Sequence, residues 1–207
     1  MSLYHPSRVI GFHSCDKEVG LKVLNGKDFL KPSKNAWDWL ADGIYFWEEN
    51  PGRALEYAVE SAAKKQFNLV RISTPFVLGA VIELGNCLNL VEKESLQILT
   101  AAYKGLKKTL DTSKDSLPKN KGDNRALDCA VIKYVHQSNL TESKPAYDTV
   151  RCAFPEGGEA YDGSAITSRL HIQIAVRNTA CIKGIFLPFP INKFNPYIYS
   201  DQWSQSA

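Results

Sequence analysis

Apolar and polar residues alternate along several short segments of the chain, and this period of two predicts β-strands. The predicted strands are 8–15, 43–47, 68–74, 77–84, 149–154, 169–177 and 182–188. The alternation is clearest near the C-terminus, where Ile172 and Ile174 point to one face while His171 and Gln173 point to the other. We expect the last two strands, which are separated by residues 178–180, to pair as a hairpin.

Apolar residues spaced three or four positions apart predict helices between these strands. The predicted helices are 16–26, 50–65, 94–110 and 125–137. Asp16, Asn50 and Asn124 stand at N-cap positions, and Pro51 stands at a first helical position, which proline favours. The charged segment 111–123 contains almost no apolar residue, so we expect it to be a mobile linker.

Composition indicates one α+β domain that spans residues 1–207. With 207 residues, of which 44% are hydrophobic, the chain is long enough to bury one large core. The two helices within residues 92–146 interrupt a chain that is otherwise rich in strands, and they have the character of a helical insertion.

The charge and the cysteine content indicate a cellular compartment but do not identify a partner. The net charge of +3 is too small to indicate a dedicated nucleic-acid binder, and it leaves both protein and nucleic-acid partners open. The lysines of residues 104–121 are typical of a solvated helix face and linker. The five cysteines are widely spaced and form no C-x-x-C pair, which is typical of reduced thiols in a cytoplasmic protein. The sequence shows no signal-like N-terminus and no apolar run of membrane-spanning length, so we expect a cytoplasmic protein without a membrane partner.

Residues 42–58 predict a strand, a turn and a helix that together form a corner. Tyr45 lies on the strand and Tyr57 lies in the helix, so the two aromatic rings can form the walls of a flat slot. The polar loop before this corner carries Trp37 and Trp39, and we expect it to act as a lid.

Three separated pieces of the sequence resemble the catalytic core of the ADP-ribosyltransferases, in the branch of diphtheria toxin and the poly(ADP-ribose) polymerases. The pieces are Gly11-Phe12-His13-Ser14, then Gly43-Ile44-Tyr45-Phe46 followed by Ala54-Leu55-Glu56-Tyr57, and last His171-Ile172-Gln173. The resemblance implies a split β-sandwich of two small mixed sheets with an NAD cleft between them. Segment 92–146 has no counterpart in it.

The resemblance also implies a role for each matching residue. Tyr45 and Tyr57 would bracket the nicotinamide ring of NAD, and Gly43 belongs to the same binding piece. His13 would donate a hydrogen bond to the adenosine-side ribose, and the backbone of Ser14 would bind the nicotinamide carboxamide. NAD would be the ADP-ribose donor, and no metal would be required.

Three positions depart from the family pattern. Ser14 stands where the family often has glycine, but it can still offer its backbone groups. Ala54 stands where the family often has serine, which removes a hydroxyl contact to the carboxamide. Gln173 stands where the family has its glutamate, and an amide cannot act as a base or offset the positive charge of the sugar. His171 could take the proton from an acceptor, or Glu156 or Glu159 could supply the missing carboxylate.

The sequence therefore predicts a mono-ADP-ribosyltransferase that modifies a protein or nucleic acid and releases nicotinamide, in the manner of bacterial toxin-like or defence enzymes. The alternative is an inactive module of the same fold that binds NAD or ADP-ribosylated ligands, and the missing glutamate motivates it. An RNA 2′-phosphotransferase is a third possibility, although the histidine and arginine set of that family is absent from the sequence.

Overall fold

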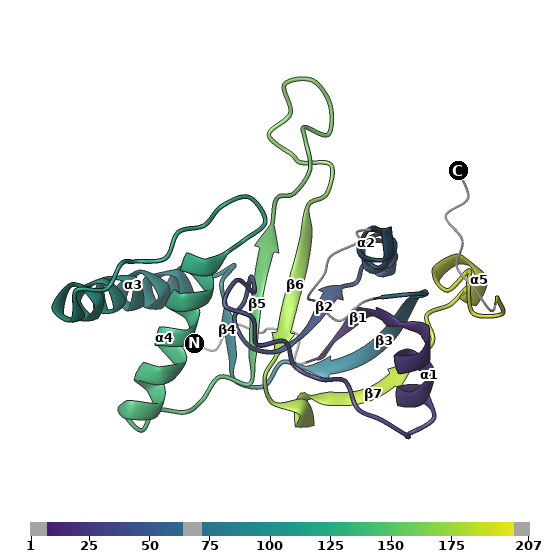
Figure 1. Cartoon of the computed structure of the whole chain (residues 1–207), viewed down its shortest axis with the longest axis horizontal. Coiled ribbons are helices and arrows are strands. Elements are labelled where there is room, and N and C mark those ends of the chain that lie inside the picture. The colour runs from purple at the N-terminus through teal and green to yellow at the C-terminus, as the bar shows by residue number, and fades with distance from the viewer. Residues whose placement is uncertain (1–7, 64–71, 201–207) are drawn as a thin grey trace.

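The computed structural model describes residues 8–63 and 72–200 of the chain. Within them, seven strands form one mixed sheet in the order β4-β5-β6-β2-β1-β3-β7 (Figure 1). The strands are β1 (Arg8–Asp16), β2 (Ile44–Glu48), β3 (Pro75–Glu83), β4 (Cys87–Asn89), β5 (Thr149–Phe154), β6 (His171–Val176) and β7 (Ile182–Phe186).

Helices cover both faces of this sheet. They are α1 (Lys17–Leu24), α2 (Pro51–Ala63), α3 (Lys93–Ser113), α4 (Ala126–Thr141) and α5 (Ile191–Phe194), with a short 3₁₀ turn η1 (Thr179–Cys181). None of the helices in these ranges is long and apolar enough to cross a membrane. The predicted caps form: the Asp16 carboxylate accepts from the Glu18 N–H, and the Asn50 side-chain oxygen accepts from the Arg53 N–H at 2.9 Å.

The α+β class predicted from the sequence is confirmed, but the strands form one sheet instead of two. Strands β4, β5, β6 and β2 form one half of the sheet, and β1, β3 and β7 form the other. The link between these halves is narrow, because β1 and β2 pair only through Gly11 with Glu48 and through Phe12 with Trp47. Beyond this short ladder, β1 continues along β3, whereas β2 continues along β6. The two halves cross at a steep angle in Figure 1, so the sheet is strongly bent.

The predicted hairpin of the last two strands is wrong. Strand β6 pairs with β2 on one edge and with β5 on the other, so neither edge is free for β7. The turn η1 instead carries the chain to the opposite end of the sheet, where β7 pairs with β3. The short separation of β6 and β7 in the sequence predicted a hairpin, but both edges of β6 are paired with other strands.

Other sequence predictions had mixed outcomes. The two inserted helices form as α3 and α4, while the short strand β4 was missed. The predicted strand 68–74 falls largely outside the described residues. The predicted linker is held at its end, because the Asn120 side-chain oxygen accepts from the Leu127 N–H at 2.9 Å and Asn124 caps Ala126.

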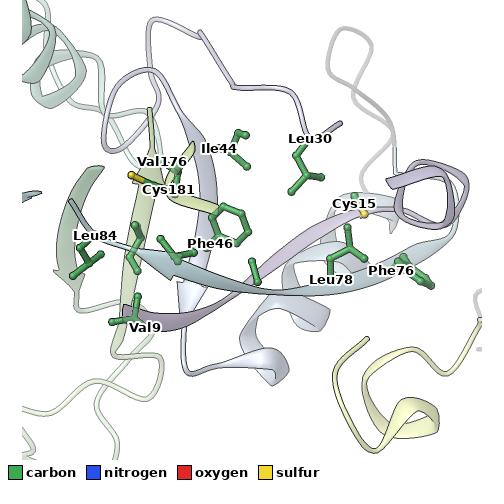
Figure 2. Packing of buried hydrophobic residues seen from close by; sticks show 13 residues of the cluster. Val9, Cys15, Leu30, Ile44, Phe46, Phe76, Leu78, Leu84, Val176 and Cys181 are labelled. Carbon is green, nitrogen blue, oxygen red and sulfur yellow. The ribbon is translucent and has the colours of Figure 1, made fainter. Parts of the chain in front are cut away.

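The two faces of the sheet have separate cores. One face packs under α1 and is centred on Phe46, Phe76 and Leu78, none of which is exposed to solvent (Figure 2). The opposite face is covered in two places, by α2 around Phe12 and Trp47, and by α3 and α4 around Leu88, Ile132 and Val150. The candidate site lies on this second face.

Candidate functional site

The register of β5, β6 and β2 places a set of predicted site residues on one face of the sheet. Gln173 of β6 stands opposite Trp47 of β2 and opposite Cys152 of β5. Directly opposed residues of antiparallel strands point to the same face, and that face also carries residues two positions away. Tyr45 and His171 therefore share the face of Gln173, which is the face that α2 and α4 cover.

A charged cluster lies over this part of the sheet. The guanidinium of Arg53, at the start of α2, is only 8% exposed and donates to the Glu156 carboxylate at 3.0 Å. The same carboxylate oxygen lies 3.5 Å from Nδ1 of His171, whose side chain is fully buried. A second ion pair joins Arg169 to Glu60 of α2 at 2.9 Å. Both ends of the loop between β5 and β6 are thus tied to α2, while its middle projects beyond the sheet (Figure 1).

Both ring nitrogens of His171 are engaged. Nδ1 lies 2.8 Å from the Arg169 carbonyl oxygen, and Nε2 lies 3.0 Å from the side-chain nitrogen of Gln173. A carbonyl only accepts, so Nδ1 carries the proton and the bare Nε2 accepts from the Gln173 amide. Burial lowers the pKa of His171; the hydrogen bond to the Arg169 carbonyl and the charge of Glu156 oppose this shift in part, and Arg53 adds a smaller lowering.

Several polar atoms beside this cluster lack a hydrogen-bond partner among the described residues. They include Nε and Nη1 of Arg53 and Nε1 of Trp47, all of which are shielded from solvent. Nη1 of Arg53 has only the Glu56 carboxylate at 3.8 Å. Buried donors without acceptors are costly, so these groups mark a polar spot beneath the surface of the site, where an acceptor would be stabilising.

The two tyrosines of the predicted slot have different surroundings. The Tyr45 hydroxyl accepts from the Leu40 N–H at 2.8 Å and donates to the Ala41 carbonyl at 2.7 Å, and burial raises its pKa. Tyr57 is 46% exposed, and its ring contacts Trp47 at a centroid distance of 5.0 Å. Trp47 is therefore an aromatic member of the site that the sequence interpretation missed, although its position two residues after Tyr45 signals a shared face.

The remaining predicted residues lie around the narrow link between β1 and β2. His13 Nδ1 lies 2.8 Å from the Tyr45 carbonyl oxygen, and its ring packs against Phe46 on the opposite face from the charged cluster. Burial lowers the His13 pKa. The Ser14 hydroxyl donates to the Ala54 carbonyl and so fastens β1 to α2.

Gly43 precedes β2 at a point where the backbone lies close to strand β6. A Cβ at Gly43 would lie 3.0 Å from the Ala175 Cβ and 3.2 Å from the Val176 carbonyl oxygen. The Gly43 N–H donates to the Ser33 carbonyl, and the Gly43 carbonyl accepts from the Ser33 N–H. Gly43 therefore lets the preceding loop lie against β6, and it stands on the Tyr45 side of the site.

The loop that carries Trp37 and Trp39 is held by several contacts in this structure, and its predicted role as a lid stays a prediction. Trp39 donates to the Asp123 carbonyl at 2.8 Å, contacts the Phe154 ring edge-on, and lies under the Arg125 guanidinium. Trp37 is 44% exposed, and its carbonyl accepts from the Arg125 N–H. Phe154 in turn lies beside His171, so this loop forms a wall at one end of the site.

The carboxylates of Glu156 and Glu159, on the loop between β5 and β6, have different surroundings. Glu156 is enclosed by Arg53 and His171, as described above, whereas Glu159 is exposed and accepts from the Gly163 N–H at 2.8 Å within its own loop. Of these two carboxylates, Glu156 is the one that the fold brings to Arg53 and His171.

No metal centre accompanies the cluster in the described part of the chain, where no three His, Cys, Asp or Glu side chains are grouped to hold an ion. An open hollow of about 490 Å³ lies elsewhere, on α3, and three of its six lining residues are lysines. It fits the solvated helix face that the sequence predicts there.

Removal of the side-chain hydroxyl should affect stability differently at Tyr45 and at Tyr57. Tyr45→Phe leaves the Leu40 N–H and the Ala41 carbonyl without their partner, and we expect the free energy of unfolding to fall by about 1–3 kcal/mol. Tyr57→Phe removes a hydroxyl from a half-exposed ring and should change stability by less than about 0.5 kcal/mol. Urea unfolding followed by tryptophan fluorescence measures both, and equal effects would contradict the assignment of the Tyr45 hydroxyl as the anchor of the loop.

Comparison with known proteins offers little about function. No family model matches the chain, and no solved structure matches it significantly. The chain is 26% identical over 195 residues to the uncharacterized protein MJ0359 of Methanocaldococcus jannaschii, and the match covers 86% of each protein. The matched length is consistent with a shared architecture, and the function has to be argued from the site.

Proposed function

We propose that this protein is a mono-ADP-ribosyltransferase that moves one ADP-ribose unit from NAD to a macromolecular acceptor and releases nicotinamide. The observation that carries the proposal is the adjacency of the three resembling pieces. They lie on β1, β2 and β6, which are neighbours in the sheet, and on α2, which packs over β1 and β2. Tyr45, Tyr57 and Gln173 belong to the face that α2 and α4 cover, whereas the His13 ring lies on the other face, against Phe46. The bent sheet with its narrow β1–β2 link supports a relation to the split β-sandwich of that family, with α3 and α4 as an insertion.

The chemistry needs a planar leaving group held in place and positive charge stabilised on the sugar. The half-exposed ring of Tyr57, backed by the buried ring of Trp47, supplies an aromatic surface on the helix that also carries Arg53. Glu156 supplies the negative charge that Gln173 lacks, at the same end of β6. The acceptor would be a protein side chain or a nucleobase, and no metal takes part.

An inactive binding module is the second candidate function. The observation that favours it is the absence of a carboxylate on β6 itself, since Gln173 donates its amide to His171. Such a protein would hold NAD or an ADP-ribosylated ligand without cleaving it. For either function we propose a cytoplasmic setting, which the five free cysteines support.

The test is to incubate the protein with NAD labelled in its adenylate part and a cell lysate, then digest with protease or nuclease. We expect label on a macromolecule together with free nicotinamide. Tyr57→Ala should weaken NAD binding roughly fivefold or more through loss of aromatic contact, whereas Tyr103→Ala on α3 should not. NAD binding by calorimetry without nicotinamide release would favour the module, and no binding at all would overturn both functions.

A further inference from the structure

His171 and Gln173 form a hydrogen-bonded pair whose polarity is set by a backbone carbonyl. Because Nδ1 of His171 donates to the Arg169 carbonyl, the neutral ring can only accept at Nε2. The Gln173 side chain must therefore turn its NH₂ group toward His171, at 3.0 Å, and direct its carbonyl oxygen away from the ring. The orientation of the amide follows from the histidine tautomer.

We propose that His171 is a positioning residue that orients the Gln173 amide, so that the amide oxygen is presented to the ribose hydroxyl of the bound nucleotide only while His171 is neutral. This inference rests on the proposed function for the identity of the ligand. The coupling between the two side chains does not depend on it.

In this structure the lone pair of His171 is not free for the other role that the sequence left open, that of a proton acceptor. A general base needs a free lone pair within reach of the acceptor, and the lone pair of His171 is occupied by Gln173. The ring is also fully buried, beneath Glu156 of the loop and Arg53 of α2. His171 therefore acts through Gln173, and Glu156 is left as the basic group of the cluster.

Protonation reverses the polarity of the pair. An imidazolium donates at both nitrogens, so the Gln173 NH₂ group can no longer face it, and the amide must turn its oxygen toward Nε2. The ribose hydroxyl then meets an NH₂ group, which cannot accept a hydrogen bond. The charged groups that face the ring are Glu156, whose negative charge favours the proton, and Arg53, whose positive charge opposes it. Burial opposes the proton as well, so the neutral pair is the state at neutral pH.

The pair can be tested without any ligand. In protein labelled with ¹⁵N at histidine, long-range NMR spectra from about pH 3 to about pH 9 report the protonation of each ring nitrogen. We expect the neutral form of His171 to carry its proton on Nδ1. Gln173→Glu places a carboxylate against Nε2, and the pKa of His171 should rise by about one unit or more. His136, whose pKa burial and Arg177 lower to about 4, lies outside the cluster and should titrate unchanged.

The pH dependence of nicotinamide release provides a second measurement that does not rely on NMR. Nicotinamide release should decline as the pH falls through the pKa of His171. His171→Gln keeps an acceptor for the Gln173 amide but cannot titrate, so it should retain activity and lose this inflection, while His171→Leu should lose activity. A neutral ring protonated on Nε2, or a His171 pKa that is the same in Gln173→Glu and wild type, would overturn the pair. If the NMR results agree and no NAD binds at any pH, the proposed function fails and the coupling stands.

Discussion

Glu156→Gln should lower nicotinamide release by about 100-fold or more while leaving NAD affinity within a few fold. In the proposed reaction the Glu156 carboxylate is the negative charge that stabilises the developing positive charge of the ribose, and an amide of the same shape cannot supply it. A change confined to the reaction step lowers kcat and spares binding. Single-turnover assays with labelled NAD, set beside calorimetry, separate the two quantities.

Glu159→Gln is the matched control, because it makes the same chemical change three residues along the same loop. Its carboxylate bonds only within the loop, and its loss should leave the rate of nicotinamide release unchanged. Since Glu156→Gln also leaves the buried Arg53 without its charged partner, stability has to be measured too. Glu156→Asp keeps the charge and shortens the reach, so it should fold and still be slow. Equal rates for the wild type and Glu156→Gln would remove Glu156 from the mechanism.

Phe46→Ala should lower the free energy of unfolding by about 3–5 kcal/mol. Phe46 is fully buried on β2, and a Cβ at Gly11 would lie only 2.7 Å from the Phe46 Cβ, so the ring fills the space where β1 and β2 meet. Its removal leaves a cavity at the narrow link between the two halves of the sheet.

Phe29→Ala makes the same substitution at a side chain that is 82% exposed, and it should change stability by less than about 0.5 kcal/mol. Chemical denaturation of both variants with wild type measures the difference. A loss of under about 1 kcal/mol for Phe46→Ala would show that the link does not depend on this ring.

The sequence interpretation succeeded where the signals are local. The Asp16 cap, the turn at Asn50 into α2 and the apolar spacing of the inserted helices all involve residues within one or two turns of each other. The alternation that set His171 and Gln173 on one face was also local, and the register of β6 agrees with it. By itself, then, the sequence determined the type of most elements, though not the short strand β4, together with the α+β class and the composition of each face.

Strand pairing and the charged cluster were decided by the tertiary structure. Strands β6 and β7 are close in sequence, but β6 had both edges filled, and no periodic pattern reveals which edges are free. Arg53 and Glu156 are 103 residues apart, and neither stands out in its own segment. Only folding brings them together beside His171, because the contact depends on how α2 packs on the sheet and how the loop before β6 returns to it. The sequence left Glu156 and Glu159 as equal candidates for the missing carboxylate, and long-range packing places only Glu156 against His171 and Arg53, while Glu159 is exposed.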